Sequence, residues 1–444
     1  MKLLQNIFSI KNQNIYKIIT ILGIKFKIKS NKLVIRSLKQ DIKNLEDYIT
    51  AQENYAKVLV RLKEKIKTEP LNVIFLSNEP QKWTYDSLYR EFEKSEYFKP
   101  LVLVYPRERT LSGKDKTLMT VDEQYQFFKN KNINVGYWYM DSKFVELKSF
   151  NPDIVFYTQL AELENIDSPV QISEYALTYY CPYGFQMADF KKNYLPTFHK
   201  LLFKYICEHN LNINRYEQYK KGNSKNCVAL GYPKLDDYII NKQIDNKKYW
   251  KNPDKFKIIY APHHTLNDRI YNFGTFLENG KFILELAKKY KDTTTWVFKP
   301  HPLLKFKLIQ DKLLSEYEID KYYEKWENIG KFYDNGDYFD IFRSSDLMIT
   351  DCASFLIEYL PTGKPLLRLR NSNSISLNKL GEYFTSQYYN SFNNEELETM
   401  FKELVIKKND YKKEERMKLI PELIDFNISS AQKIYEFIKG ELQE

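Results

Sequence analysis

The sequence predicts an α/β protein made of two Rossmann-like halves. A chain of 444 residues is long enough for two domains of roughly 150 to 200 residues each plus extensions. Short apolar runs alternate with segments of helical spacing, as in parallel sheets with crossover helices. A polar stretch, Asn241–Lys255, separates two sets of such runs. Hydrophobic residues make up 43% of the chain, so we expect it to fold.

The first set of apolar runs predicts the sheet of an N-terminal domain over residues 70–245. The expected strands are Val73–Leu76, Leu101–Tyr105, Val135–Trp138, Ile154–Tyr157 and Val228–Leu230.

The second set predicts the sheet of a C-terminal domain over residues 246–444. Its expected strands are Lys257–Ala261, Thr295–Lys299, Leu347–Thr350 and Leu366–Leu369, and its expected helices are Phe276–Tyr290, Leu303–Glu316 and Phe355–Leu360. We expect a final helical region, Glu414–Leu442, to cross back to the first domain. Two such domains place the carboxyl ends of their strands around one cleft, where ligands bind in open α/β sheets.

Residues 1–69 form a basic extension with fifteen Lys and Arg against six Asp and Glu, which accounts for +9 of the whole chain's net charge of +10. Cations alternate with bulky apolar residues up to Gln40, and an amphipathic helix is expected over Leu38–Lys67. This pattern favours contact with an anionic membrane surface. The alternative is a solvated basic strand pair packed on the body. Nucleic acid is disfavoured, because the charge is confined to one end without an accompanying motif.

The remaining composition favours a cytoplasmic protein on the inner face of the cell membrane. The four cysteines are widely spaced, which indicates neither a zinc site nor a disulfide framework. No stretch approaches the roughly 20 apolar residues that a membrane span requires.

Polar motifs stand where the predicted strands end, so we expect them at the carboxyl edge of the second sheet. His263 and His264 follow one strand, and Lys299 and His301 follow the next. The prolines on either side of His301 restrict its backbone, which suits an imidazole aimed at a phosphate oxygen. The alternative is a histidine that only closes a loop.

The segment from Ser345 to Ser354 predicts an anion site. Asp351 ends a strand, and Ser354 is expected to cap a helix that begins at Phe355, whose free amides would hold a diphosphate. Glu358 is placed to accept from ribose hydroxyls, or is a solvated carboxylate. Arg368, at the end of the next strand, is either a phosphate partner or a surface charge.

These motifs closely resemble those of the CDP-glycerol glycerophosphotransferases, which polymerise or prime wall teichoic acids and some capsules. The resemblance rests on Tyr260-Ala-Pro, His301-Pro302, the segment Ser345-Asp-Leu-Met-Ile-Thr-Asp351-Cys-Ala-Ser354, Gly-Lys-Pro365 and Gly231-Tyr-Pro-Lys-Leu-Asp236. It implies a GT-B fold, a nucleotide donor held by the C-terminal domain, an acceptor held by the N-terminal domain, and no bound metal or other cofactor.

The acceptor side departs from the family, whose N-terminal domain carries a Trp-His-Gly-Thr-Pro segment with a general-base histidine. The corresponding region here reads Tyr179-Tyr-Cys-Pro-Tyr-Gly-Phe185, without a histidine. A tyrosine is a poor base at neutral pH. The remaining candidates for the base are His263, His264 and Glu174, of which His263 is favoured and Glu174 is next; the alternative is that His263 and His264 only cap their loop. His301 and Lys299 are expected to balance the pyrophosphate charge.

The resemblance implies a transferase that moves glycerol phosphate, or a related CDP-linked group, onto a hydroxyl of a capsular or teichoic-type polysaccharide or lipid-linked acceptor, releasing CMP. One alternative is a capsule or lipooligosaccharide glycosyltransferase that uses a CMP-, UDP- or GDP-sugar. A second is a non-catalytic scaffold of a capsule assembly complex.

Overall fold

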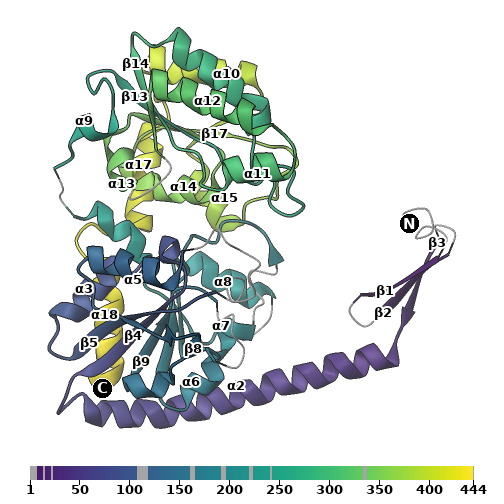
Figure 1. Cartoon of the computed structure of the whole chain (residues 1–444), viewed down its shortest axis with the longest axis vertical. Coiled ribbons are helices and arrows are strands. Elements are labelled where there is room, and N and C mark those ends of the chain that lie inside the picture. The colour runs from purple at the N-terminus through teal and green to yellow at the C-terminus, as the bar shows by residue number, and fades with distance from the viewer. Residues whose placement is uncertain are drawn as a thin grey trace.

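The computed structural model describes residues 8–13, 16–21, 24–107, 119–160, 166–191, 197–219, 224–240, 243–333 and 338–443. Two α/β halves lie one above the other, and a long helix projects from the lower half to a small sheet at its far end (Figure 1). The predicted α/β class with two parallel sheets is confirmed.

The N-terminal half contains a parallel sheet of seven strands in the order β12-β11-β10-β9-β4-β5-β6. Alternate residues of β4 enter two separate apolar clusters, so both faces of the sheet are covered. The strands are β4 (Leu71–Ser77), β5 (Phe98–Val104), β6 (Val135–Tyr137), β9 (Ile154–Tyr157), β10 (Leu177–Tyr180), β11 (Lys204–Cys207) and β12 (Cys227–Ala229). The helices are α3 (Asp86–Lys94), α5 (Val121–Asn130), α6 (Pro169–Ser173), α7 (Thr197–Leu201) and α8 (Asn210–Tyr219).

The C-terminal half contains a parallel sheet of six strands in the order β15-β14-β13-β16-β17-β18. The strands are β13 (Phe256–Ala261), β14 (Thr294–Phe298), β15 (Lys331–Phe332), β16 (Leu347–Thr350), β17 (Leu366–Leu369) and β18 (Tyr389–Ser391). The helices are α10 (Phe276–Lys289), α11 (Leu304–Gln310), α12 (Glu316–Ile329), α13 (Phe339–Ser344), α14 (Ala353–Glu358), α15 (Lys379–Thr385) and α16 (Asn394–Phe401).

The expected single helix Leu303–Glu316 is wrong. The chain turns at Lys312, whose φ is +55°, and Ser315 starts α12 with a capping box. Its hydroxyl accepts from the Glu318 N–H at 3.3 Å while the Glu318 carboxylate accepts from the Ser315 N–H at 2.8 Å. The pair Ser315 and Glu318 was the sequence signal for this second helix.

The chain ends in two helices, α17 (Lys413–Leu423) in the upper half and α18 (Ser430–Gln443) in the lower half, so the predicted return to the first domain is confirmed. Figure 1 shows α18, in yellow, beside α3 of the lower half. Tyr435 packs its ring against Phe92 and Phe98 and hydrogen-bonds through its hydroxyl to Ser95 at 2.9 Å. The last helix is therefore part of the N-terminal core.

The two halves meet through backbone contacts and a shared apolar cluster. Residues 186–189 lie along residues 376–378, where Asn378 N–H donates to Met187 O at 2.7 Å and Asp189 N–H donates to Ser376 O at 2.9 Å. One buried cluster includes residues from both halves, among them Phe156 and Met348.

The N-terminal extension consists of a three-stranded antiparallel sheet and the 35-residue helix α2 (Asn31–Lys65). The strands are β1 (Phe8–Gln13), β2 (Tyr16–Ile21) and β3 (Ile24–Lys29). The second half of α2 packs on the body, where the Tyr55 hydroxyl donates to Leu201 O at 2.8 Å. Across the described ranges, no helix is both long and apolar enough to cross a membrane.

Candidate functional site

Three imidazoles meet at the carboxyl edge of the C-terminal sheet. His263 and His264 follow β13, and His301 follows the neighbouring strand β14. The ring centroid of His301 lies 5.1 Å from that of His263 and 3.9 Å from that of His264. The structure thus brings together residues that are far apart in the sequence, as expected for adjacent parallel strands.

Asp351 holds this cluster in place from the end of β16. Its buried carboxylate accepts the His263 N–H at 2.6 Å, the Thr275 N–H at 2.6 Å and the Thr275 hydroxyl at 2.8 Å. Burial raises the pKa of Asp351 to about 6, although the three hydrogen bonds act in the opposite direction. Asp351 therefore fixes the loop after β13 and the start of α10.

Hydrogen bonds at Nδ1 orient two of the histidine rings. The Leu303 N–H donates to Nδ1 of His301 at 3.1 Å, so the proton of this neutral imidazole resides on Nε2. Nδ1 of His263 lies 2.8 Å from the Thr265 hydroxyl, which can donate or accept, and 3.3 Å from the Thr265 N–H. Burial lowers the pKa of His263 well below its usual value and that of His301 to about 3, so both rings are neutral at pH 7.

The three rings bring their nitrogens close together. The nearest ring nitrogens of His263, His264 and His301 lie within 4.8 Å of one another, which is close enough for shared ligation of a metal ion. In His301, Nε2 carries the proton while Nδ1 accepts the Leu303 N–H, so this ring favours an anion over a metal ion.

Two buried cations lie at the carboxyl ends of strands of the same sheet, Lys299 after β14 and Arg368 in β17. The Nζ atom of Lys299 lies 4.9 Å from the centroid of the Tyr338 ring and 5.7 Å from that of Phe355. Arg368 is opposite Thr350 in the β16–β17 register and is only 7% exposed. Burial, with a contribution from Arg370, lowers the pKa of the Arg368 guanidinium to about 9.

Arg368 has no hydrogen-bond or ion-pair partner within the described part of the chain. A buried guanidinium in that state carries a desolvation cost that a bound anion would offset.

Ser354 lies in the first turn of α14, but the expectation that it caps this helix is wrong. The helix begins at Ala353 and Cys352 is the residue before it, so Ser354 has helical backbone. Its hydroxyl lies 3.4 Å from the Cys352 sulfur.

Glu358, at the other end of α14, is fully buried at the junction of the two halves. It accepts from Lys234 Nζ at 3.0 Å and from the Tyr338 hydroxyl, so its carboxylate is occupied by protein donors.

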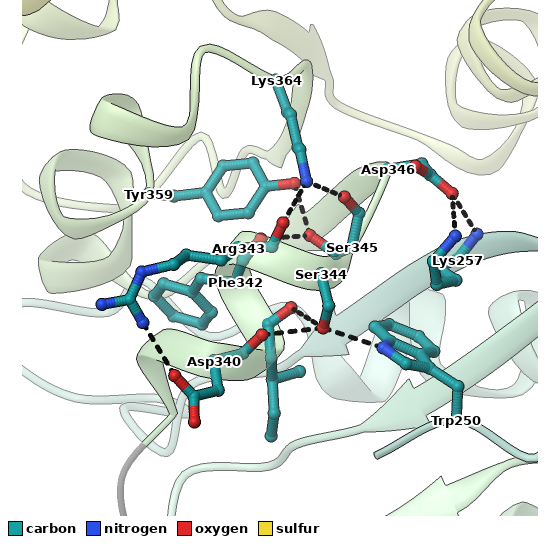
Figure 2. Close-up of polar contacts among 11 residues, drawn as sticks. Trp250, Lys257, Asp340, Phe342, Arg343, Ser344, Ser345, Asp346, Tyr359 and Lys364 are labelled. Atoms are coloured by element: carbon teal, nitrogen blue, oxygen red, sulfur yellow. Dashed lines mark hydrogen bonds and ion pairs between the residues drawn. The ribbon is translucent and has the colours of Figure 1, made fainter. Parts of the chain in front are cut away.

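Ser345 lies at the opposite end of β16 from Asp351, away from the histidines. Figure 2 shows it inside a packed polar network, where its hydroxyl donates to Phe342 O at 2.9 Å and lies 2.8 Å from the Tyr359 hydroxyl. Lys364 donates to the Ser345 carbonyl oxygen in the same network. These contacts give Ser345 and Lys364 a structural role at the amino edge of the sheet.

Glu174 also lies on the edge that faces away from the C-terminal half. It follows α6 and precedes β10, and its exposed carboxylate lies 3.5 Å from Lys148 Nζ. The structure does not bring Glu174 together with His263.

A charged group at the carboxyl edge of the N-terminal sheet escaped the sequence analysis. Glu79 follows β4 and pairs with Lys82 at 2.9 Å and with Arg107 at 2.5 Å, and Lys82 Nζ lies 4.8 Å from the Tyr183 ring centroid. Both side-chain polar atoms of the buried Asn78 lack partners in the described structure. The sequence signal was a set of charges directly after predicted strands.

A second carboxylate on this edge, Glu208, follows β11 and was also not predicted. It is buried and accepts from the Gln186 N–H at 3.2 Å and from Asn212 Nδ2 at 2.9 Å. Burial raises its pKa to about 7. Glu208 borders a cavity of about 600 Å³ that extends to residues 421–427, where the chain leaves the C-terminal half.

The family comparison agrees with these motifs. Residues 204–420 match the family described as CDP-glycerol:poly(glycerophosphate) glycerophosphotransferase. This part of the chain is similar to that family. The matched segment contains His263, His301, Asp351 and Arg368 but ends before α18. No curated protein is significantly similar to the chain in sequence.

Solved structures confirm the GT-B fold of the chain. A putative UDP-N-acetylglucosamine 2-epimerase from Listeria monocytogenes aligns with a TM-score of 0.54 and 14% identity over 84% of this chain and 97% of its own. The UDP-GlcNAc 2-epimerase from Neisseria meningitidis bound to UDP-GlcNAc aligns with a TM-score of 0.54 and 14% identity, over 84% of this chain and 99% of its own. Anabaena Alr3699/HepE in complex with UDP aligns with a TM-score of 0.52 and 9% identity, over 84% of this chain and 100% of its own.

The segment Gly231–Asp236, which resembles a motif of the glycerophosphotransferase family, joins the halves. Asp236 accepts the Ser430 N–H at 2.7 Å and the Ala431 N–H at 2.9 Å, and so caps α18. Gly231 has a φ of +94°, and a Cβ there would lie 2.5 Å from the Ser430 hydroxyl oxygen. In this chain the motif fixes the returning helix.

Proposed function

We propose that the chain transfers a glycerol-phosphate or related CDP-linked group from a cytidine-nucleotide donor to a hydroxyl of a capsular or teichoic-type surface polysaccharide, releasing CMP. The observation that carries this proposal is the convergence of His263, His301, Lys299 and Arg368 at one sheet edge, within the segment that matches the glycerophosphotransferase family.

In the proposed donor site, these residues bind the diphosphate. His263 and His301 donate from Nε2, while Lys299 and Arg368 balance the negative charge. The amides at the start of α14, with the Ser354 hydroxyl, are the remaining donors on this edge. Asp351 acts indirectly, because its carboxylate is already filled by His263 and Thr275.

In the proposed reaction, an acceptor hydroxyl oxygen bonds to the β-phosphorus, the bond from that phosphorus to the bridging oxygen breaks, and CMP leaves. Positioning and charge neutralisation contribute most of the rate in such transfers. We assign the acceptor proton to Glu79, because this carboxylate follows β4 at the carboxyl edge of the N-terminal sheet. We assign His263 to the diphosphate, instead of the base role expected from the sequence, because its ring lies beside that of His301 in the same cluster.

We also propose that the basic sheet β1–β3 holds the protein on the anionic inner face of the cell membrane. Residues 8–29 carry five lysines and no acidic residue. Each such cation near the headgroups contributes about 1 kcal/mol.

A nucleotide panel tests the function. Purified protein is melted with CDP-glycerol, CDP, CMP, UDP and GDP, and ligands that bind the folded state raise the melting temperature as their concentration passes Kd. We expect the cytidine nucleotides to stabilise the protein most, with CMP released when CDP-glycerol and an acceptor are both present. Selective stabilisation by UDP or GDP would instead indicate a glycosyltransferase, and no stabilisation by any nucleotide would indicate a scaffold.

A further inference from the structure

Helix α2 carries an apolar stripe that its own body does not cover. Five side chains in its projecting half are between 47% and 58% exposed. They are Ile35, Leu38, Ile42, Leu45 and Ile49. Their spacing alternates between three and four residues, which is the a/d pattern of a coiled-coil seam.

The stripe lies on the opposite side of the helix from the residues that pack on the body. At about 100° of rotation per residue, Ala51 lies about 180° around the axis from Ile42, and Val58 lies about 180° from Ile49. Ala51 and Val58 are both buried against the N-terminal half. A second helix can therefore lie along the stripe without displacing any contact of the body.

The stripe continues beyond the projecting segment. Val60, which is 67% exposed, lies about 20° around the axis from Ile49 and so falls on the same side. Ile35 and Val60 are separated by about 37 Å of helix at 1.5 Å per residue. Figure 1 shows this helix running from the body to the small sheet without another element beside its outer half.

The charge of this segment favours a protein partner over a lipid surface. Residues 31–50 carry four basic and three acidic side chains, so they are nearly neutral, whereas residues 8–29 carry five lysines and no acid. An interfacial membrane helix has a wide apolar face flanked by cations. A narrow a/d seam without flanking cations is typical of a coiled-coil helix and not of an interfacial membrane helix.

We propose that α2 pairs with α2 of a second copy of this chain as a parallel two-stranded coiled coil. Isoleucine occupies the a positions 35, 42 and 49, and leucine occupies the d positions 38 and 45, which is the combination that favours parallel dimers. Asp41 and Glu46 face each other across such a pair, but exposed like charges cost little compared with the packing of the core. The parallel arrangement places both basic sheets at the same end.

Sedimentation of the full chain between about 1 and 100 µM tests the pairing. We expect a dimer that dissociates on dilution. The double variant Ile42→Asp, Leu45→Asp should sediment as a monomer throughout and keep a cooperative melting transition, because both side chains are exposed in the single chain. The matched control Gln40→Asp, Lys43→Asp places the same charges off the seam and should dimerise like the parent. A parent that is monomeric at 100 µM, or a seam variant that dimerises like the control, would overturn the proposal.

Oxidative cross-linking tests the orientation. A Leu38→Cys variant should form a disulfide-linked dimer, since equivalent d positions meet only in a parallel pair. Gln40→Cys, on the outer face, should not. Efficient cross-linking of both, or of neither, contradicts the parallel arrangement. If the seam variant instead loses binding to vesicles of anionic lipid while the parent stays monomeric, the stripe contacts lipid and the pairing is refuted.

Discussion

The buried carboxylate of Glu208 is expected to make stability depend on pH. Its pKa is raised by burial to about 7 in the folded protein, against 4.5 for the free side chain. Below pH 4.5 the Glu208 carboxyl is protonated in both the folded and unfolded states, so its ionisation does not reduce the stability of the fold. As pH rises toward 7, the unfolded chain ionises first, so stability is lost through this window. Between low and high pH, ionisation of Glu208 lowers the free energy of unfolding by about 3 kcal/mol in total, at about 1.4 kcal/mol per unit of pKa difference.

The measurable part of this loss lies between pH 5.5 and 8, where the same linkage gives about 2 kcal/mol. Glu208→Gln removes the titration. The Gln side chain can still accept the Gln186 N–H, and Asn212, whose Oδ1 lacks a partner, can turn to accept from the new amide. We expect the free energy of unfolding of the variant, measured relative to that of the parent, to rise by about 2 kcal/mol between pH 5.5 and pH 8.

Urea unfolding at both pH values, followed by tryptophan fluorescence, measures this difference. Asp351 titrates in the same direction with a pKa of about 6, so the variant retains part of the pH dependence. A parent and variant whose free energies of unfolding change in parallel with pH would refute the assignment, because the pH dependence would then arise elsewhere.

Four further outcomes are expected. His263→Gln should weaken CDP binding by roughly 10- to 150-fold, which is the range for a lost hydrogen bond to a charged group, while turnover at saturating donor stays nearly unchanged. Calorimetric titration measures the affinity, and steady-state kinetics measures the turnover. Glu79→Gln should lower turnover by roughly 100-fold or more without changing CDP affinity, whereas Glu174→Gln should not affect turnover. If both variants lost turnover equally, Glu79 would not be the group that takes the proton. Gly231→Ala should lower the thermal midpoint in calorimetry, because its φ of +94° and the nearby Ser430 hydroxyl oppose a Cβ; an unchanged midpoint would show that the loop relaxes freely. Deletion of residues 1–29 should release the protein from anionic vesicles while preserving nucleotide-induced stabilisation; retained vesicle binding would show that another surface contacts lipid.

The sequence predicted the fold well where apolar runs were long and bounded. Strands such as Ile154–Tyr157 and Leu347–Thr350 were found at their observed positions. Strands β10 and β11 were missed although they have the same length, because Lys204 and the tyrosines obscure their apolar character. Strands of mixed composition are defined by pairing with their neighbours, and pairing is not a local property.

The C-terminal side of the site was largely visible in the sequence, because parallel strands bring their carboxyl ends to one edge. That rule places His263, His301 and Asp351 together without knowledge of any side-chain contact. Applied to the predicted strand Leu347–Thr350, the same rule places Ser345 at the amino end, away from the histidines. It could not show that Glu358 is already bound by Lys234. That contact joins the two halves, and local patterns do not encode it.

The position of α18 bears on how the protein is made. Ile434, Ile438 and Leu442 are buried in the same apolar cluster as Phe75 of β4, although hundreds of residues separate them along the chain. During synthesis the N-terminal half emerges from the ribosome first, but its core lacks this helix until the C-terminal half has also emerged. The order of translation therefore leaves Phe92 and Phe98 without their Tyr435 partner in the nascent chain, where they are a potential binding site for chaperones until the last helix arrives.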